Sequence, residues 1–181
     1  MLSFIKSLFS SKKENSKVII NHTWAINPIK IYIAPLNFAN YDDCKIKYRD
    51  MVVKAFNIWA NASGNKINFE VTESLIDSNI NIDWKRVDKN TLAQCYYNYN
   101  EQGLLYGAEI SIGLYTKRIG VIDYDKEVYH SILHCVGLAL GVSQTNNLDD
   151  IMCIPHQYGK IELSENDKKS IFNLYNVETF N

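Results

Sequence analysis

The sequence predicts an α/β domain, because segments with the alternating pattern of a strand are interleaved with two long segments of helical periodicity. Ile29, Ile31 and Ile33 occupy alternate positions, which predicts a strand with one buried face. Between Asp42 and Ala62 the apolar residues recur every three or four positions and so share one face of a helix. A second long helix is expected over 123–140.

The remaining elements follow in chain order. Gly64 is placed to end the first helix, because glycine readily adopts the left-handed conformation found at helix ends. Three more strands are expected at 66–72, 78–85 and 108–114. Their inward-facing residues are apolar and alternate: Ile67, Phe69 and Val71; Ile80, Ile82 and Trp84; Ile110, Ile112 and Leu114. The last helix, over 163–176, starts with a capping box formed by Ser164 and Asp167.

Length and composition indicate a globular domain of ordinary size. The chain has 181 residues, of which 46% are hydrophobic and 22% are charged. A net charge of −1 gives no electrostatic attraction to nucleic acid, so no nucleic-acid partner is expected. The four cysteines have no paired short spacing, which argues against a disulfide scaffold or a cysteine-based zinc motif and favours a cytoplasmic location.

The chain is expected to divide into a short tail, residues 1–20, and one domain, residues 21–181. The tail is predicted to be disordered or amphipathic, and its apolar run is interrupted by Lys6, unlike that of a signal peptide. It is too short to span a bilayer. One alternative is that residues 1–11 rest on a membrane surface and tether a purely structural domain.

The segment that carries chemical information, residues 130–144, reads HSILHCVGLALGVSQ, and DIM follows at 150–152. Read from His134, it resembles the zinc-protease signature HExxHxxGxxH of the metzincins, which is followed by a Met-turn. The similarity is to the matrixin branch and extends from about Trp24 to Tyr175. The framework residues of the motif are present: His134, Gly137, Ala139, Leu140, Gly141, Asp150, Ile151 and Met152.

This resemblance implies a twisted, mainly parallel sheet with two long helices and a small C-terminal helical subdomain. It also implies a cleft along an edge strand that pairs with an extended substrate. The residues at that edge strand would be Leu92, Ala93, Gln94 and Cys95. Met152 would form a hydrophobic floor below the zinc ion that is the family's cofactor. The family's activity is zinc-dependent cleavage of peptide bonds.

The residues that perform this chemistry are replaced. Cys135 stands at the catalytic glutamate, and Leu138 and Gln144 stand at the second and third zinc-ligand histidines, so only His134 of the ligand set remains. Leucine offers zinc no lone pair, and an amide oxygen is a poor zinc ligand. Without the glutamate, a metal-bound water would lack its proton acceptor. We therefore expect no zinc cofactor and an inactive pseudo-peptidase that binds a peptide or protein in its cleft.

A second interpretation is an active zinc endopeptidase with an atypical site. His130 and His134 are four residues apart and would share a helix face. Three residues could complete such a site: Cys135, His156 and Asp150. In this register Ser131 replaces the glutamate and Leu140 the third histidine, and Leu140 is too far from Met152 for the family pattern. Otherwise, His130 is expected to pack or hydrogen-bond on the helix surface.

Two further features have plain structural interpretations. Adjacent helical residues diverge by about 100°, so Cys135 and His134 cannot form a catalytic dyad, and Cys135 is expected to be a small buried hydrophobe. Tyr96, Tyr97 and Tyr99 follow the expected edge strand. They are either a peptide-binding surface or half-exposed strand packing, and the pattern favours packing.

Overall fold

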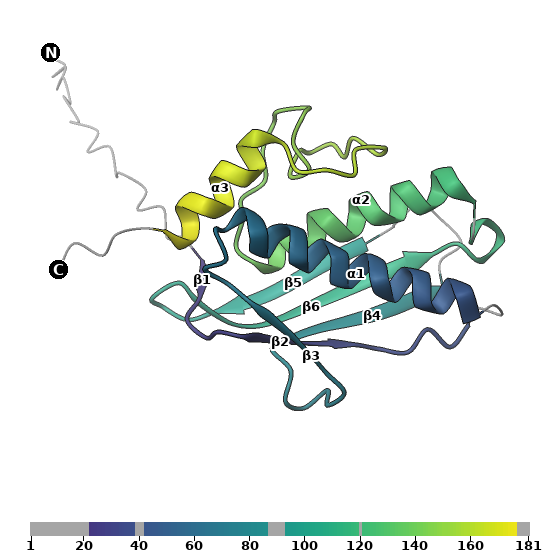
Figure 1. The fold of residues 1–181 in the computed structure, drawn as a ribbon, viewed down its shortest axis with the longest axis horizontal. Helices are drawn as coiled ribbons and strands as arrows, with labels where there is room; N and C mark the ends of the chain where they lie inside the picture. Colours follow the sequence, from purple (N-terminus) through teal and green to yellow (C-terminus); the bar gives the residue numbers. More distant parts are fainter. Residues whose placement is uncertain (1–21, 39–41, 87–92, 120, 177–181) are drawn as a thin grey trace, which may run out of the picture.

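The computed structural model describes residues 22–38, 42–86, 93–119 and 121–176, and these form a sheet with helices on one side (Figure 1). Six strands make the sheet: β1 (Thr23–Trp24), β2 (Ile29–Ile33), β3 (Phe69–Thr72), β4 (Ile80–Arg86), β5 (Ala93–Tyr99) and β6 (Leu104–Leu114). The helices are α1 (Asp42–Ala62), α2 (Ile122–Ala139) and α3 (Glu165–Tyr175), with a 3-10 turn, η1 (Thr116–Arg118). Helices α1 and α2 lie along the same face of the sheet (Figure 1).

The sheet is mainly parallel, as predicted. Its strand order is β1-β6-β4-β2-β3, and every neighbouring pair in this order is parallel. Strand β5 pairs with β6 in the antiparallel direction. The prediction of an α/β domain is therefore confirmed. The bounds of α1 agree with the expected helix, whereas β3 starts three residues later than expected and β6 begins at Leu104, before the expected strand.

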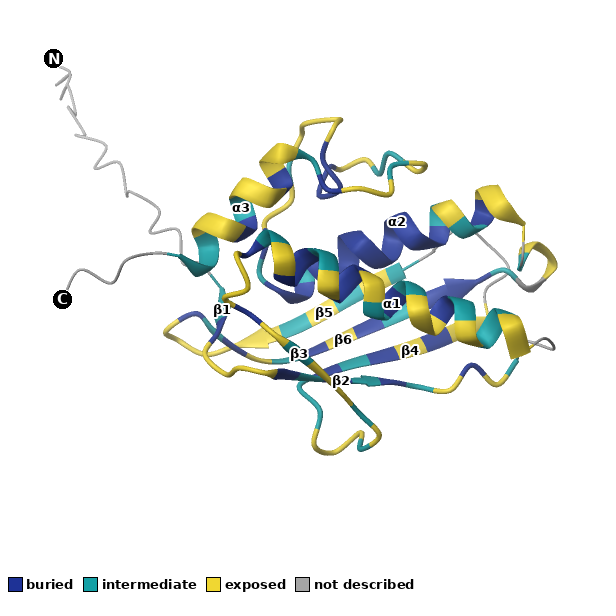
Figure 2. Cartoon of the chain, viewed as in Figure 1, coloured by how far each residue is buried: buried dark blue, intermediate teal, exposed yellow. Residues whose placement is uncertain are grey.

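The core lies between the sheet and the two long helices. The alternation expected in β2 and β4 is confirmed, because Ile29, Ile31, Ile33, Ile80, Ile82 and Trp84 are all buried. Figure 2 shows α2 buried along most of its length, while α1 buries one face and exposes the other. Val71 pairs in register with the buried Ile31 and so lies on the same face of the sheet, as expected, but it is 37% exposed. Strand β3 is the last in the strand order, so among the described strands it has a sheet neighbour on one side only.

The C-terminal end of α2 is held by residues from both ends of the described chain. The Trp24 indole Nε1 donates a hydrogen bond to the Ala139 carbonyl oxygen at 2.8 Å. The Tyr175 hydroxyl donates to the Leu140 carbonyl oxygen at 2.9 Å and accepts from the Trp24 backbone N–H at 3.3 Å. These bonds satisfy carbonyl groups that the end of a helix leaves without intrahelical partners. The bend after α2 is thereby fixed against β1 and α3.

We predict that Gly141→Ala strongly destabilises the fold. Gly141 has a φ of +86°, and a Cβ atom there would lie 1.8 Å from the His22 carbonyl oxygen. The backbone strain and the overlap together should lower the free energy of unfolding by about 3 kcal/mol, as measured by urea denaturation. Gly159→Ala is the matched control: its φ is +109°, but a Cβ atom would meet nothing within 4 Å. An equal loss of stability in both variants would mean that the overlap with the His22 carbonyl oxygen does not contribute.

Several expectations concern residues outside the described ranges. They include the tail, residues 1–20, with its suggested membrane contact at 1–11, and Leu92 of the expected edge strand. Among the residues that the structure does describe, no helix is long and apolar enough to cross a membrane.

Candidate functional site

The site predicted from the sequence lies where α2 meets the turn at residues 150–153. The His134 Nδ1 atom lies 2.9 Å from the Ile151 carbonyl oxygen. Met152 is fully buried and packs against Gly137, where a Cβ atom would come within 2.5 Å of its Sδ atom. The same Cβ atom would lie 2.7 Å from Trp59 Cζ2 of α1. Gly137 thus allows the turn and both long helices to pack closely together.

The turn at 150–153 is anchored by Asp167, in the first turn of α3. The Asp167 carboxylate accepts hydrogen bonds from the backbone N–H groups of Ile151, at 2.7 Å, and Met152, at 3.3 Å. It also accepts from the Ser164 N–H at 3.0 Å, which completes the expected capping box. The sequence pattern predicted this cap but gave no indication that the same carboxylate holds the turn.

Asp150 is a second buried carboxylate at this turn. It accepts hydrogen bonds from four side chains: Ser164 at 2.6 Å, Asn166 at 2.7 Å, Thr145 at 2.8 Å and Asn147 at 2.9 Å. Burial alone would raise the pKa of Asp150, but these four hydrogen bonds outweigh it and lower the pKa. The carboxylate is therefore ionised and engaged by its donors, so it is not available to complete a metal site.

The positions that the matrixin resemblance would make catalytic hold a thiol, an apolar side chain and an amide: Cys135, Leu138 and Gln144. Cys135 is buried, as expected, and burial raises the pKa of its thiol, which keeps it neutral and unsuited to be a base or a nucleophile. Leu138 packs against the core and Gln144 is exposed. In the part of the chain that the structure describes, no group of three or more His, Cys, Asp or Glu side chains is arranged to hold a metal ion.

The structure instead gathers three histidines beside the turn. His156 follows the turn, and its ring centroid lies 4.4 Å from that of His134 and 5.8 Å from that of His130. His130 forms a hydrogen bond, as expected, but it is fully buried and does not lie on the helix surface. Its Nδ1 atom lies 2.9 Å from the Lys160 carbonyl oxygen, on the loop that follows His156. We call His130, His134 and His156 the histidine cluster.

The surroundings of the histidine cluster favour the neutral form of its imidazoles. Burial lowers the pKa of all three imidazoles, and it brings that of His134 to about 4. Tyr158 borders the cluster, with its ring centroid 5.5 Å from those of His130 and His156. A signal for this cluster was present in the sequence, since three of the four histidines occur between positions 130 and 156.

Strand β5 occupies an edge position next to β6. Within the described ranges it has no second strand partner. Ala93, Cys95 and Tyr97 are half-buried, on the side of β5 that contacts α2, while Gln94, Tyr96 and Asn98 are exposed. Tyr97 and Tyr99 pack near the His22 ring, at centroid distances of 5.8 Å and 3.8 Å, whereas Tyr96 is 64% exposed. Tyr97 and Tyr99 therefore take part in ring packing, whereas Tyr96 belongs to the exposed surface of the strand.

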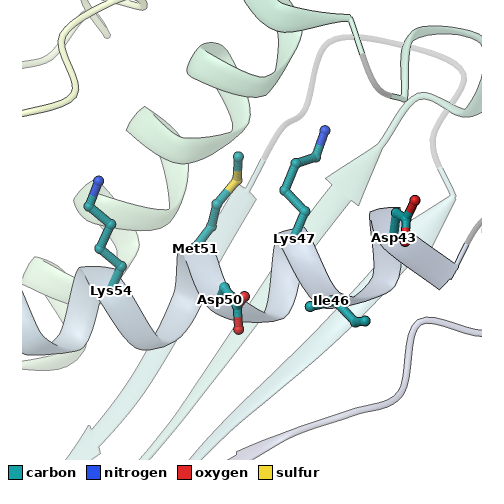
Figure 3. A pocket seen from close by; sticks show the side chains of 6 residues that line it. All are labelled: Asp43, Ile46, Lys47, Asp50, Met51 and Lys54. Carbon is teal, nitrogen blue, oxygen red and sulfur yellow. The ribbon is translucent and has the colours of Figure 1, made fainter.

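A shallow hollow lies on the outer side of α1 (Figure 3). All the residues that line it come from this one helix: Asp43, Ile46, Lys47, Asp50, Met51 and Lys54. Lys47 is bound to Asp125 of α2 at 2.6 Å. Because the hollow combines charges of both signs on a single helix, it indicates no particular ligand.

Comparison of the chain with protein-family models gave no match, and comparison with curated proteins gave none either.

Proposed function

We propose that this chain is a pseudo-peptidase of the matrixin type, which has lost hydrolysis and binds an extended peptide or protein segment. The observation that carries the proposal is the contrast within α2 and the turn after it. The framework is kept, with the bend at Gly141 and Met152 packed beneath the helix. The chemistry is not kept, because a buried neutral thiol, Cys135, stands where the catalytic carboxylate would be.

The edge of β5 supports a binding role. A strand at the edge of a sheet offers unpaired N–H and C=O groups to which an extended peptide can add as a further strand. The exposed side chains of Gln94, Tyr96 and Asn98 could then contact the peptide's own side chains. An exposed tyrosine is a favourable contact residue, because its ring buries a large area while its hydroxyl group stays hydrogen-bonded.

Two measurements on the full chain test this function. Casein and a quenched fluorescent peptide should not be cleaved, with or without added Zn²⁺. Peptides selected on the protein from a random library should bind, and Tyr96→Ala should weaken that binding about tenfold. Ile76→Ala is the control, because Ile76 is 94% exposed on the loop between β3 and β4. Equal weakening of peptide binding by both substitutions would exclude the edge of β5 as the binding site.

The cleavage assay also tests the alternative of an active enzyme with an atypical site on His130 and His134. The observation in its favour is that His156 joins these two residues. Against it, the Ser131 hydroxyl at the carboxylate position of that register donates its proton to the Glu127 carbonyl oxygen at 2.9 Å. Chelator-sensitive cleavage that His134→Ala abolishes would replace the pseudo-peptidase proposal with this one.

A further inference from the structure

We propose that the crevice between the start of α1 and the ends of β2, β3 and β4 binds a small organic carboxylate with an apolar body. The crevice has a volume of about 490 Å³, which lies within the range of about 300–1,000 Å³ that is usual for small-molecule sites. It is distinct from the hollow of Figure 3, with which it shares only Ile46. The site is separate from the edge of β5, because β4 and β6 lie between β2 and β5.

The first argument is the place of the crevice in the sheet. Strand β2 pairs in parallel with β3 on one side and with β4 on the other. The chain leaves β2 through α1 to reach β3, whereas it leaves β4 in the opposite direction, toward β5 and β6. Open parallel sheets bind ligands outside the carboxyl ends of their strands, at such a change of direction. Residues from three of these ends line the crevice: 32–37 in and after β2, Glu73 after β3, and Trp84 near the end of β4.

The second argument is the positive charge on one wall of the crevice. Lys45 and Arg49 both line it, and they are four residues apart on α1, so they lie on one side of the helix. Lys45 pairs with Asp42 at 2.9 Å, and the Asp42 side chain is 87% exposed. Arg49 lies 3.9 Å from Glu73, which is 95% exposed, and this distance is too long for a hydrogen bond. Because exposed pairs of this kind are weak, an anion in the crevice can replace either acidic partner.

The arrangement of charges favours a carboxylate over a phosphate group or a cation. The Arg49 guanidinium offers a pair of N–H donors that matches the two oxygens of a carboxylate, and Lys45 adds a second positive charge. A phosphate group would favour the N-terminus of α1, but Asp42 and Asp43 in the first turn would repel it. A cationic ligand would face two like charges and only one acidic lining residue, Glu73.

The third argument is the apolar part of the lining. Trp84 is buried, and its Nε1 atom donates a hydrogen bond to the Ala34 carbonyl oxygen at 2.7 Å, which fixes the indole against the segment after β2. Leu36 is buried as well, whereas Ile46 is 60% exposed. The apolar body of a ligand would remove the Ile46 side chain from water. Because the indole is already held in place, binding costs little ordering of the protein.

Titration of the ¹⁵N-labelled full chain with phenylpropionate, followed by NMR, tests the site. The chain has three tryptophans and so gives three indole N–H signals. We expect phenylpropionate to shift the signal of Trp84. The signals of Trp24 and Trp59 should stay in place, because their Nε1 atoms donate to carbonyl oxygens of α2, at 2.8 Å and 2.9 Å. The uncharged phenylpropanol and the cationic phenylpropylamine should bind about tenfold more weakly, or less well still.

Two matched variants of α1 assign the binding to the crevice. Arg49→Gln should weaken phenylpropionate binding about tenfold, and the exposed position of Arg49 makes loss of the fold no concern. Lys54→Gln removes a positive charge from the same helix outside the crevice, so it should bind as the unaltered chain does. The proposal is overturned if phenylpropionate shifts no indole signal or all three alike, if phenylpropylamine binds equally well, or if the two variants bind equally well. Peptide binding at β5 is measured separately, so the two proposals fail independently.

Discussion

Asp167→Ala is expected to lower the free energy of unfolding by about 3–7 kcal/mol. The substitution removes the acceptor for the N–H groups of Ile151 and Met152, both of which belong to fully buried residues. Water cannot readily replace the lost carboxylate there, so each donor contributes about 1–3 kcal/mol of desolvation cost. Loss of the capping box with Ser164 adds about 1 kcal/mol. Urea denaturation at pH 7 measures the difference.

Glu165→Ala provides the control in the same helical turn. Glu165 is exposed and pairs with Lys168 on the surface, so its removal should leave the free energy of unfolding nearly unchanged. Asp167→Asn should fall between the two, because one amide oxygen remains to accept while the amide nitrogen cannot. A loss for Asp167→Ala no larger than that for Glu165→Ala would mean that the turn at 150–153 does not depend on α3.

Elements set by local patterns could be predicted from the sequence. Helix α1 has its expected bounds because one apolar face runs from Tyr48 to Trp59 and Gly64 takes a positive φ just after it. The cap of α3 could also be predicted, since Ser164 and Asp167 are three residues apart. The side chain of each accepts a hydrogen bond from the backbone N–H of the other. Each of these features depends on residues within a few positions of one another.

Features that depend on distant segments could not be predicted. His130 is buried, and its hydrogen-bond partner is the carbonyl oxygen of Lys160, thirty residues further along the chain. The exposure of Val71 follows from the position of β3 at the end of the strand order, which its alternating pattern does not reveal. The family resemblance marked Asp150 as part of the framework, but the four side chains that bind it come from two separate segments.

The stability of the protein should fall steeply as the pH drops from about 6.5 to about 4. Burial lowers the pKa of His134 from 6.5 to about 4. Between these two pH values His134 is protonated in the unfolded chain but not in the folded protein. The contribution of His134 to stability is complete above its pKa in the unfolded chain and is lost as the pH falls to its pKa in the folded protein. A shift of this size corresponds to about 3 kcal/mol, and the lowered pKa values of His130 and His156 act in the same direction.

Urea denaturation in the presence of a chelator, at intervals between pH 7.5 and 4.5, measures this loss. His134→Gln keeps a donor for the Ile151 carbonyl oxygen but does not titrate, so the slope should decrease by up to about 1.4 kcal/mol per pH unit. His22→Gln lies outside the cluster and should keep the full slope. Asp150 does not add to the slope in this range. Its pKa is lowered from 3.8, so its contribution to the free energy of unfolding is lost only below that pH. Constant stability over the whole range would mean that the cluster takes up protons in the folded protein as readily as in the unfolded chain, contrary to its lowered pKa values.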